Sequence, residues 1–121
     1  MKFADFLSEA AIKPDLAAVD KQGVIEELVA SLVLVGAVDA SEQSNIVEAV
    51  LKREELGSTG IGRGVAVPHT KHASVDQLIG TVGISAEGVD FNSLDGRRVQ
   101  LFFFLVDRRL LLNRDAAALA V

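Results

Sequence analysis

The chain has 121 residues, of which half are hydrophobic and about a quarter are charged, so we expect one domain with a buried core. The 17 acidic and 12 basic residues leave a formal net charge of −5. This balance argues against general binding to nucleic acids, which needs clustered Lys and Arg. Cysteine is absent, which excludes disulfide scaffolds, thiolate metal sites and cysteine nucleophiles.

The first residues favour a cytoplasmic location. Asp5 stands where the apolar region of a signal peptide would run. No apolar stretch reaches the ~18 residues that a membrane span needs, because charged residues at 107–109 interrupt the longest candidate. We therefore expect no direct insertion into a membrane.

Helical patterns dominate the first half of the chain. Residues 1–13 are predicted to form a short helical lead-in, and residues 16–19 a short first strand. Apolar residues at helical spacing predict a helix over 24–35 and a second helix over 42–55. Residues suited to begin or end these helices are Asp20, Gly36, Asp39 and Ser41.

Strand patterns dominate the second half. Residues 78–85 alternate well enough for a strand, and Asp95-Gly96 marks a turn. Residues 99–106, VQLFFFLV, are almost continuously apolar, as in a strand that is buried on both faces. Together with the helices, this predicts an α/β fold in which a mixed sheet is sandwiched between helices. A helix is expected to begin at Asn113.

A glycine-rich segment, GSTGIGRG at 57–64, separates the two halves. It is not a P-loop, because Arg63 and Gly64 stand where that motif needs Lys and a hydroxyl residue. Nor is it a dinucleotide-binding fingerprint, because its glycines are spaced G-x-G-x-G and follow a helix rather than a strand.

The segment leads to a histidine that is suited to accept a phosphoryl group. His69 is the nucleophile, and at neutral pH a neutral imidazole keeps one nitrogen with a free lone pair. Arg53 supplies a permanent positive charge. A lone histidine or a glycine loop is more often structural, and only their combination favours chemistry. The expected phosphate-binding groups are the hydroxyls of Ser58 and Thr59 and the backbone at Gly60, Gly62 and Gly64. His72 is expected to be a solvated loop residue.

Residues 53–71, REELGSTGIGRGVAVPHTK, resemble the phosphorylation-site signature of enzyme IIA domains of the bacterial sugar phosphotransferase system, in the fructose, mannitol and nitrogen-related class. A weaker resemblance extends from about residue 3 to residue 106. It implies a three-layer α/β/α fold, with His69 as phospho-acceptor and Arg53 as its charge-stabilising partner. Arg63 and Thr70 depart from the family pattern, which commonly has a small polar residue and a glycine at these positions.

The resemblance also implies partners. Such domains accept phosphate from the phosphocarrier protein HPr and pass it to a IIB domain, with no metal and no organic cofactor. A phosphotransferase role in sugar transport is therefore the leading hypothesis. The alternative is a regulatory, nitrogen-related module that docks to transporters or kinases and is switched by histidine phosphorylation.

The C-terminal residues differ most from the family. Residues 107–121, DRRLLLNRDAAALAV, contain no histidine, whereas relatives usually carry a second histidine there and further helices. We therefore expect a single domain over 1–121 that is abbreviated at its C-terminus. Because the strand at 99–106 would then lack cover, we expect a homo-oligomer that associates through the surface around Phe102, Phe104 and Leu110–Leu112.

Overall fold

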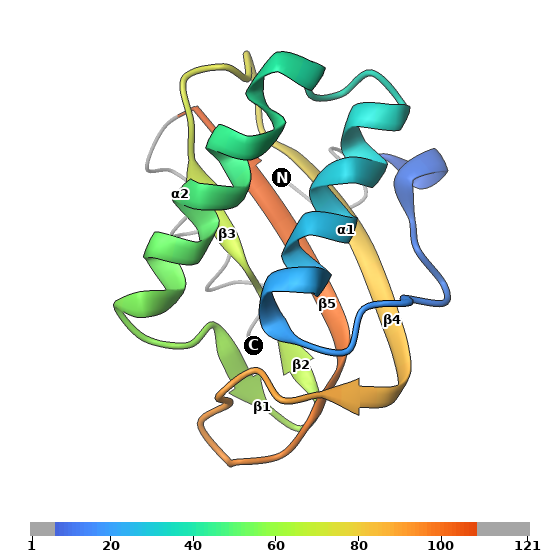
Figure 1. The fold of residues 1–121 in the computed structure, drawn as a ribbon, viewed down its shortest axis with the longest axis vertical. Helices are drawn as coiled ribbons and strands as arrows, with labels where there is room; N and C mark the ends of the chain where they lie inside the picture. Colours follow the sequence, from blue (N-terminus) through green and yellow to red (C-terminus); the bar gives the residue numbers. More distant parts are fainter. Residues whose placement is uncertain (1–6, 109–121) are drawn as a thin grey trace.

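A computed structural model describes residues 7–108, which form a five-stranded mixed sheet and two α-helices (Figure 1). The helices are α1 (Lys21–Leu34) and α2 (Gln43–Glu55), with short 3₁₀ turns η2 (Glu9–Ala11) and η3 (Ala40–Glu42). The strands are β1 (Gly60–Gly62), β2 (Val65–Ala66), β3 (His69–Lys71), β4 (Ile79–Val89) and β5 (Val99–Asp107).

Strand β5 is the central strand of the sheet. It pairs in parallel with β2 and β3 along one edge and antiparallel with β4 along the other, while β1 forms a hairpin with β2. Its side chains alternate between the two faces, and Phe102, Phe104 and Val106 are fully buried in the core. The apolar run at 99–106 is therefore an interior strand, as its composition predicts.

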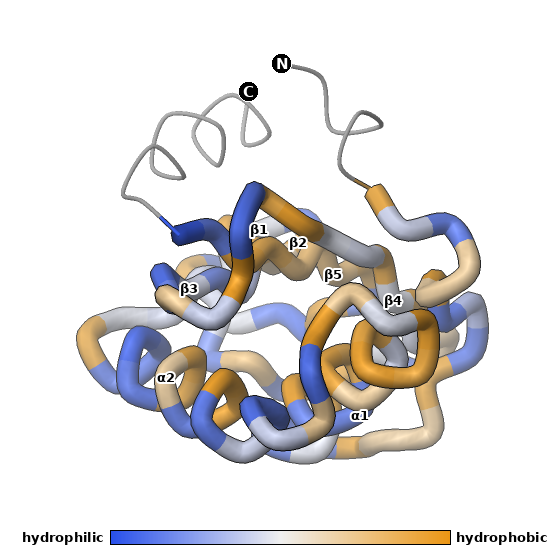
Figure 2. The backbone as a smooth tube through the Cα atoms, turned by 90° about the horizontal axis from the view of Figure 1, so that it is seen from above, coloured by the Kyte–Doolittle hydropathy of each residue, from blue (hydrophilic) through white to orange (hydrophobic). Residues whose placement is uncertain are grey.

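Both described helices cover the same face of this sheet (Figure 2). Helix α1 lies over β4, where Gly83 leaves room for Leu16 and Leu28, and α2 lies over β3. The apolar stripe of α2, formed by Ile46 and Val50, is fully buried. The predicted α/β fold with a mixed sheet is confirmed, and the described residues do not test the helical layer expected on the opposite face.

The predicted ends of the first helix agree with the structure, whereas the predicted cap of the second does not, because Glu42 precedes α2 and makes no side-chain capping hydrogen bond. Asp20 caps α1 by accepting a 2.7 Å hydrogen bond from the Gly23 amide. Asp39 accepts a hydrogen bond from the Ser41 amide, which starts the turn η3 just before α2. Beyond the C-terminal end of α1, Gly36 adopts a φ of +78°, the left-handed conformation that glycine tolerates best.

The N-terminal segment differs from its sequence prediction. Residues 7–13 are not a helix: Leu7 and Lys13 form bridges to β4, and only the turn η2 lies between them. Residues 16–19 are not a strand, although the Leu16 amide donates to the Ile84 carbonyl. The open edge of β4 satisfies this backbone, so tertiary pairing overrides the local helical pattern. The lead-in residues Phe3 and Phe6 lie outside the described residues.

The surface expected to drive self-association is also placed differently. Phe102 and Phe104 have no exposed area, because they point towards α1 and α2 in the core. They are therefore unavailable to a second copy, and the prediction that they line an association surface is wrong. Residues 110–112 and the predicted helix from Asn113 lie outside the described residues.

Candidate functional site

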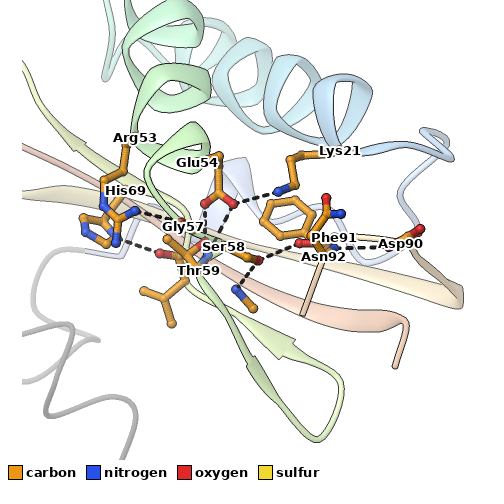
Figure 3. Close-up of polar contacts among 12 residues, drawn as sticks. Lys21, Arg53, Glu54, Gly57, Ser58, Thr59, His69, Asp90, Phe91 and Asn92 are labelled. Carbon is orange, nitrogen blue, oxygen red and sulfur yellow. Dashed lines mark hydrogen bonds and ion pairs between the residues drawn. The ribbon is translucent and has the colours of Figure 1, made fainter. Parts of the chain in front are cut away.

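His69 is the first residue of β3, directly after Pro68, and is half-buried. Its Nδ1 atom lies 2.7 Å from the carbonyl oxygen of Val67 (Figure 3). Since a carbonyl oxygen only accepts hydrogen bonds, Nδ1 carries the proton. The neutral imidazole therefore presents an unprotonated Nε2 with a free lone pair.

Burial lowers the pKa of His69 from its ordinary value of 6.5 and outweighs the hydrogen bond to Val67, which acts in the opposite direction. The positive charge of Arg53 lowers this pKa further, whereas the negative charge of Glu54 raises it. The net effect keeps the imidazole neutral at physiological pH. A neutral ring is the form that attacks a phosphorus atom.

Arg53 lies beside His69 in the last turn of α2 (Figure 3). Its guanidinium donates a 2.9 Å hydrogen bond to the Gly57 carbonyl, which fixes the side chain against the start of the glycine loop. Within residues 7–108, no carboxylate forms an ion pair with it. Its charge is therefore available to an anion bound at His69.

Ser58 and Thr59 are engaged in holding the loop. The Ser58 hydroxyl donates a 2.6 Å hydrogen bond to the Phe91 carbonyl, and the Thr59 hydroxyl donates to the carboxylate of Glu54. Both hydroxyl protons are thus used within the chain. Of the residues predicted from the sequence, the structure brings Arg53 to His69. The side chains of Ser58 and Thr59 instead contact Phe91 and Glu54.

Gly60, Gly62 and Gly64 are required by the backbone conformation of the loop. At Gly60 a Cβ atom would lie 2.9 Å from the Cα of Ser93, so only glycine lets these two segments approach. Gly62 and Gly64 have φ values of +103° and +79° on either side of Arg63, at +57°. This left-handed run closes the β1–β2 hairpin, and the Arg63 amide is held by Asp95.

His72 has the opposite hydrogen-bond arrangement. Its Nδ1 atom accepts the Ser74 amide at 3.2 Å and lies 2.6 Å from the Ser74 hydroxyl. The neutral ring therefore carries its proton on Nε2. Its accepting nitrogen is already occupied, which agrees with the expectation that His72 is a loop residue rather than the nucleophile.

The sequence analysis missed Glu54 and the carbonyl of Val67. Glu54 stands next to Arg53 but near the C-terminal end of α2, where the helix dipole disfavours a negative charge. A negative charge at this end of a helix was the sequence feature that could have indicated a special role for Glu54. The Val67 carbonyl left no signal, because every residue carries the same group.

In the part of the chain from 7 to 108, no three His, Cys, Asp or Glu residues gather closely enough to hold a metal ion. The helices of that part are also too short to cross a bilayer.

The fold and the site define an α/β domain that places the imidazole of His69 beside the guanidinium of Arg53. The chain belongs to the family of EIIA type 2 domains of the phosphoenolpyruvate-dependent sugar phosphotransferase system, whose family model matches residues 5–109.

Two curated relatives represent two branches of this family. The fructose-specific EIIABC component of Bacillus subtilis is 39% identical over 105 residues, which is 87% of this chain and 16% of that protein. The nitrogen regulatory protein of Bradyrhizobium diazoefficiens is 32% identical over 106 residues, which is 88% of this chain and 67% of that protein. The chain thus spans about one sixth of the first relative and two thirds of the second.

Solved structures show the same two branches. The nitrogen regulatory protein IIA-Ntr of Neisseria meningitidis has a TM-score of 0.81 and 31% identity, covering 96% of this chain and 77% of that one. The IIA mannitol structure from Escherichia coli has a TM-score of 0.76 and 25% identity, covering 91% of this chain and 77% of that one. Both likenesses confirm the fold.

Proposed function

We propose that the chain is a phosphoryl carrier that accepts phosphate on Nε2 of His69 from phosphorylated HPr and passes it to a IIB domain. One observation carries this proposal: the bond from Nδ1 to the Val67 carbonyl leaves Nε2 unprotonated beside Arg53, which forms no ion pair within residues 7–108. The amides of Gly57, Thr59, Gly60 and Arg63 already donate within the chain, so the proposal assigns phosphate contacts in the loop to the backbone at Gly62 and Gly64.

In the proposed step, the lone pair of Nε2 forms a bond to phosphorus as the bond from phosphorus to the donor imidazole breaks. The electron pair of that broken bond returns to the donor. The proton on Nδ1 of His69 stays in place, and the Val67 carbonyl stabilises the positive charge that develops on the ring. Arg53 offsets the charge on the phosphoryl oxygens. In the transfer to IIB, a nucleophile of the IIB domain forms the bond to phosphorus as the bond from phosphorus to Nε2 breaks, and the electron pair of that bond returns to Nε2.

The relatives support the choice of partners. The fructose-specific relative combines its IIA, IIB and IIC parts in one component. A fold neighbour, the IIA mannitol enzyme of Escherichia coli, was determined in a complex with phosphorylated IIB. A IIB domain is therefore the acceptor that we propose for this chain.

A regulatory module is the second candidate function. It is favoured by the nitrogen regulatory relatives, of which the Neisseria meningitidis structure matches 96% of this chain. In this version, phosphorylation of His69 adds about 1.5–2 negative charges beside Arg53. That change would alter how the domain docks to a transporter or kinase.

The decisive experiment mixes the chain with radiolabelled, phosphorylated HPr, isolates it and maps the label. We expect an acid-labile phosphate on a histidine. The isolated phosphoprotein is then mixed with a IIB domain from the same cell. Passage of the label to IIB supports the carrier, whereas stable label with altered docking supports the regulatory module. Absence of label with active HPr would contradict both.

The rate of phosphoryl transfer should fall at low pH with a midpoint below 6.5. The reason is that burial and the charge of Arg53 lower the pKa of His69, so protonation blocks Nε2 only below the ordinary value. The rate is measured from pH 5 to 8, and the ring of His69 is titrated by NMR in parallel. A midpoint at or above 6.5, or one that does not follow the titration of His69, would contradict this expectation.

A further inference from the structure

Lys21 and Glu54 form a buried ion pair that the proposed reaction does not use directly. The Lys21 ammonium lies 3.0 Å from a carboxylate oxygen of Glu54, whose side chain is only 2% exposed. Lys21 is the first residue of α1, and Glu54 lies in the last turn of α2. The dipole of each helix disfavours the charge that it carries there. The pair therefore has a role other than stabilising its own helices.

A continuous series of contacts leads from this pair to the imidazole. The Glu54 carboxylate accepts the Thr59 amide at 3.2 Å and also the Thr59 hydroxyl. The Thr59 carbonyl in turn accepts the Val67 amide at 3.0 Å. The carbonyl of Val67 then holds Nδ1 of His69 at 2.7 Å. The carboxylate thus fixes the strand segment whose carbonyl decides where the imidazole proton sits.

A second series of contacts leads from Lys21 to the first residues of the glycine loop. The Lys21 ammonium lies 4.7 Å from the centre of the Phe91 ring, a cation–π contact. The Phe91 carbonyl accepts the Ser58 hydroxyl, and the Ser58 oxygen accepts the Gly60 amide at 2.9 Å. Figure 3 shows Lys21 beside both Glu54 and the ring of Phe91. The loop is therefore held at two points by one buried pair.

We propose that Glu54, neutralised by Lys21, is a positioning residue that keeps His69 in the tautomer with Nδ1 protonated and Nε2 free. Arg53 and Glu54 are adjacent in α2 but have different roles. The Arg53 side chain faces the imidazole, and the Glu54 side chain anchors the loop. The effect on the tautomer does not depend on phosphorylation. Only its kinetic consequence rests on the proposed function.

The test uses nitrogen-15 NMR of the imidazole rings in the unphosphorylated full chain. In the unchanged protein, His69 should carry its proton on Nδ1 and His72 on Nε2. Glu54→Ala removes the acceptor of Thr59, so the proton of His69 should redistribute between the two ring nitrogens. His72 serves as an internal reference whose tautomer stays unchanged. Glu55→Ala is the matched control, because it removes an exposed carboxylate from the same turn.

Glu54→Gln keeps an oxygen that accepts from Thr59 but removes the negative charge. The tautomer of His69 should therefore persist in this variant, while its pKa falls, because the charge of Glu54 raises it. This second variant also covers the case in which Glu54→Ala does not fold. An unchanged tautomer in folded Glu54→Ala, or a redistributed tautomer in folded Glu54→Gln, would overturn the proposal.

Phosphoryl transfer from HPr completes the test. Glu54→Ala should transfer about 10- to 100-fold more slowly, as expected when a reacting group is misplaced, and Glu54→Gln should recover much of that loss. If the unchanged protein accepts no phosphate, the proposed function fails while the tautomer result still decides this inference. Equal transfer rates in Glu54→Ala, Glu55→Ala and the unchanged protein would reject the kinetic consequence.

Discussion

Replacing His69 by alanine should abolish phosphorylation of the chain by HPr. The side chain presents the free Nε2 of the site, and the protein around it would retain its fold because the imidazole is only half-buried. Covalent transfer to a missing nitrogen has no substitute pathway. The measurement is incorporation of radiolabel after incubation with phosphorylated HPr.

The matched control for this variant is His72→Ala. His72 holds its accepting nitrogen against Ser74, so most of the label should remain when it is removed. Intact folding of both variants is checked by circular dichroism and thermal unfolding. Label that survives in His69→Ala and disappears in His72→Ala would show that the nucleophile has been assigned to the wrong histidine.

The second large effect is expected for Arg53→Ala. Loss of a charge contact in a phosphoryl-transfer site costs about 3 kcal/mol of activation free energy, or roughly 100-fold in rate. The cost to folding should be smaller, about 1–2 kcal/mol, because the variant loses one hydrogen bond to Gly57 and one favourable charge at the end of α2. Transfer rates and urea unfolding measure the two costs separately.

Lys52→Ala is the control for Arg53→Ala. Lys52 is the other basic residue in the last turn of α2, and its ion pair with Glu48 is exposed. Its replacement should therefore change neither the transfer rate nor the stability much. Arg53→Lys should transfer at an intermediate rate, since a lysine keeps the charge but not the two-pronged geometry. Near-normal transfer by Arg53→Ala would leave Arg53 with a purely structural role.

Much of the fold was predictable because its signals are local. The apolar run of β5 identifies an interior strand wherever it sits in the sheet. The stripe of α2 and the cap at Asp20 depend on residues within two turns of helix. The segment from Arg53 to His69 is equally local, so its resemblance to a family signature was visible before the fold was known.

The errors in the sequence analysis arose where distant residues decide the conformation. Residues 7–13 have a helical pattern, but the edge of β4 binds them as an extended segment. The contacts of the Ser58 and Thr59 hydroxyls with Phe91 and Glu54 also come from distant or folded neighbours, whereas their predicted role as phosphate donors stays a prediction. Phe102 and Phe104 were assigned to a surface because nothing in the strand itself says which face the helices cover.

The amino-acid sequence determined the class of fold, the ends of the first helix, the interior strand and the residue types of the proposed site. The tertiary structure decided the state of those residues. Only the folded chain brings the carbonyl of Val67 to Nδ1 of His69 and buries Glu54 against Lys21. Tautomer, pKa and loop position depend on desolvation and on contacts across 33 residues of sequence, and no pattern of neighbouring residues encodes them.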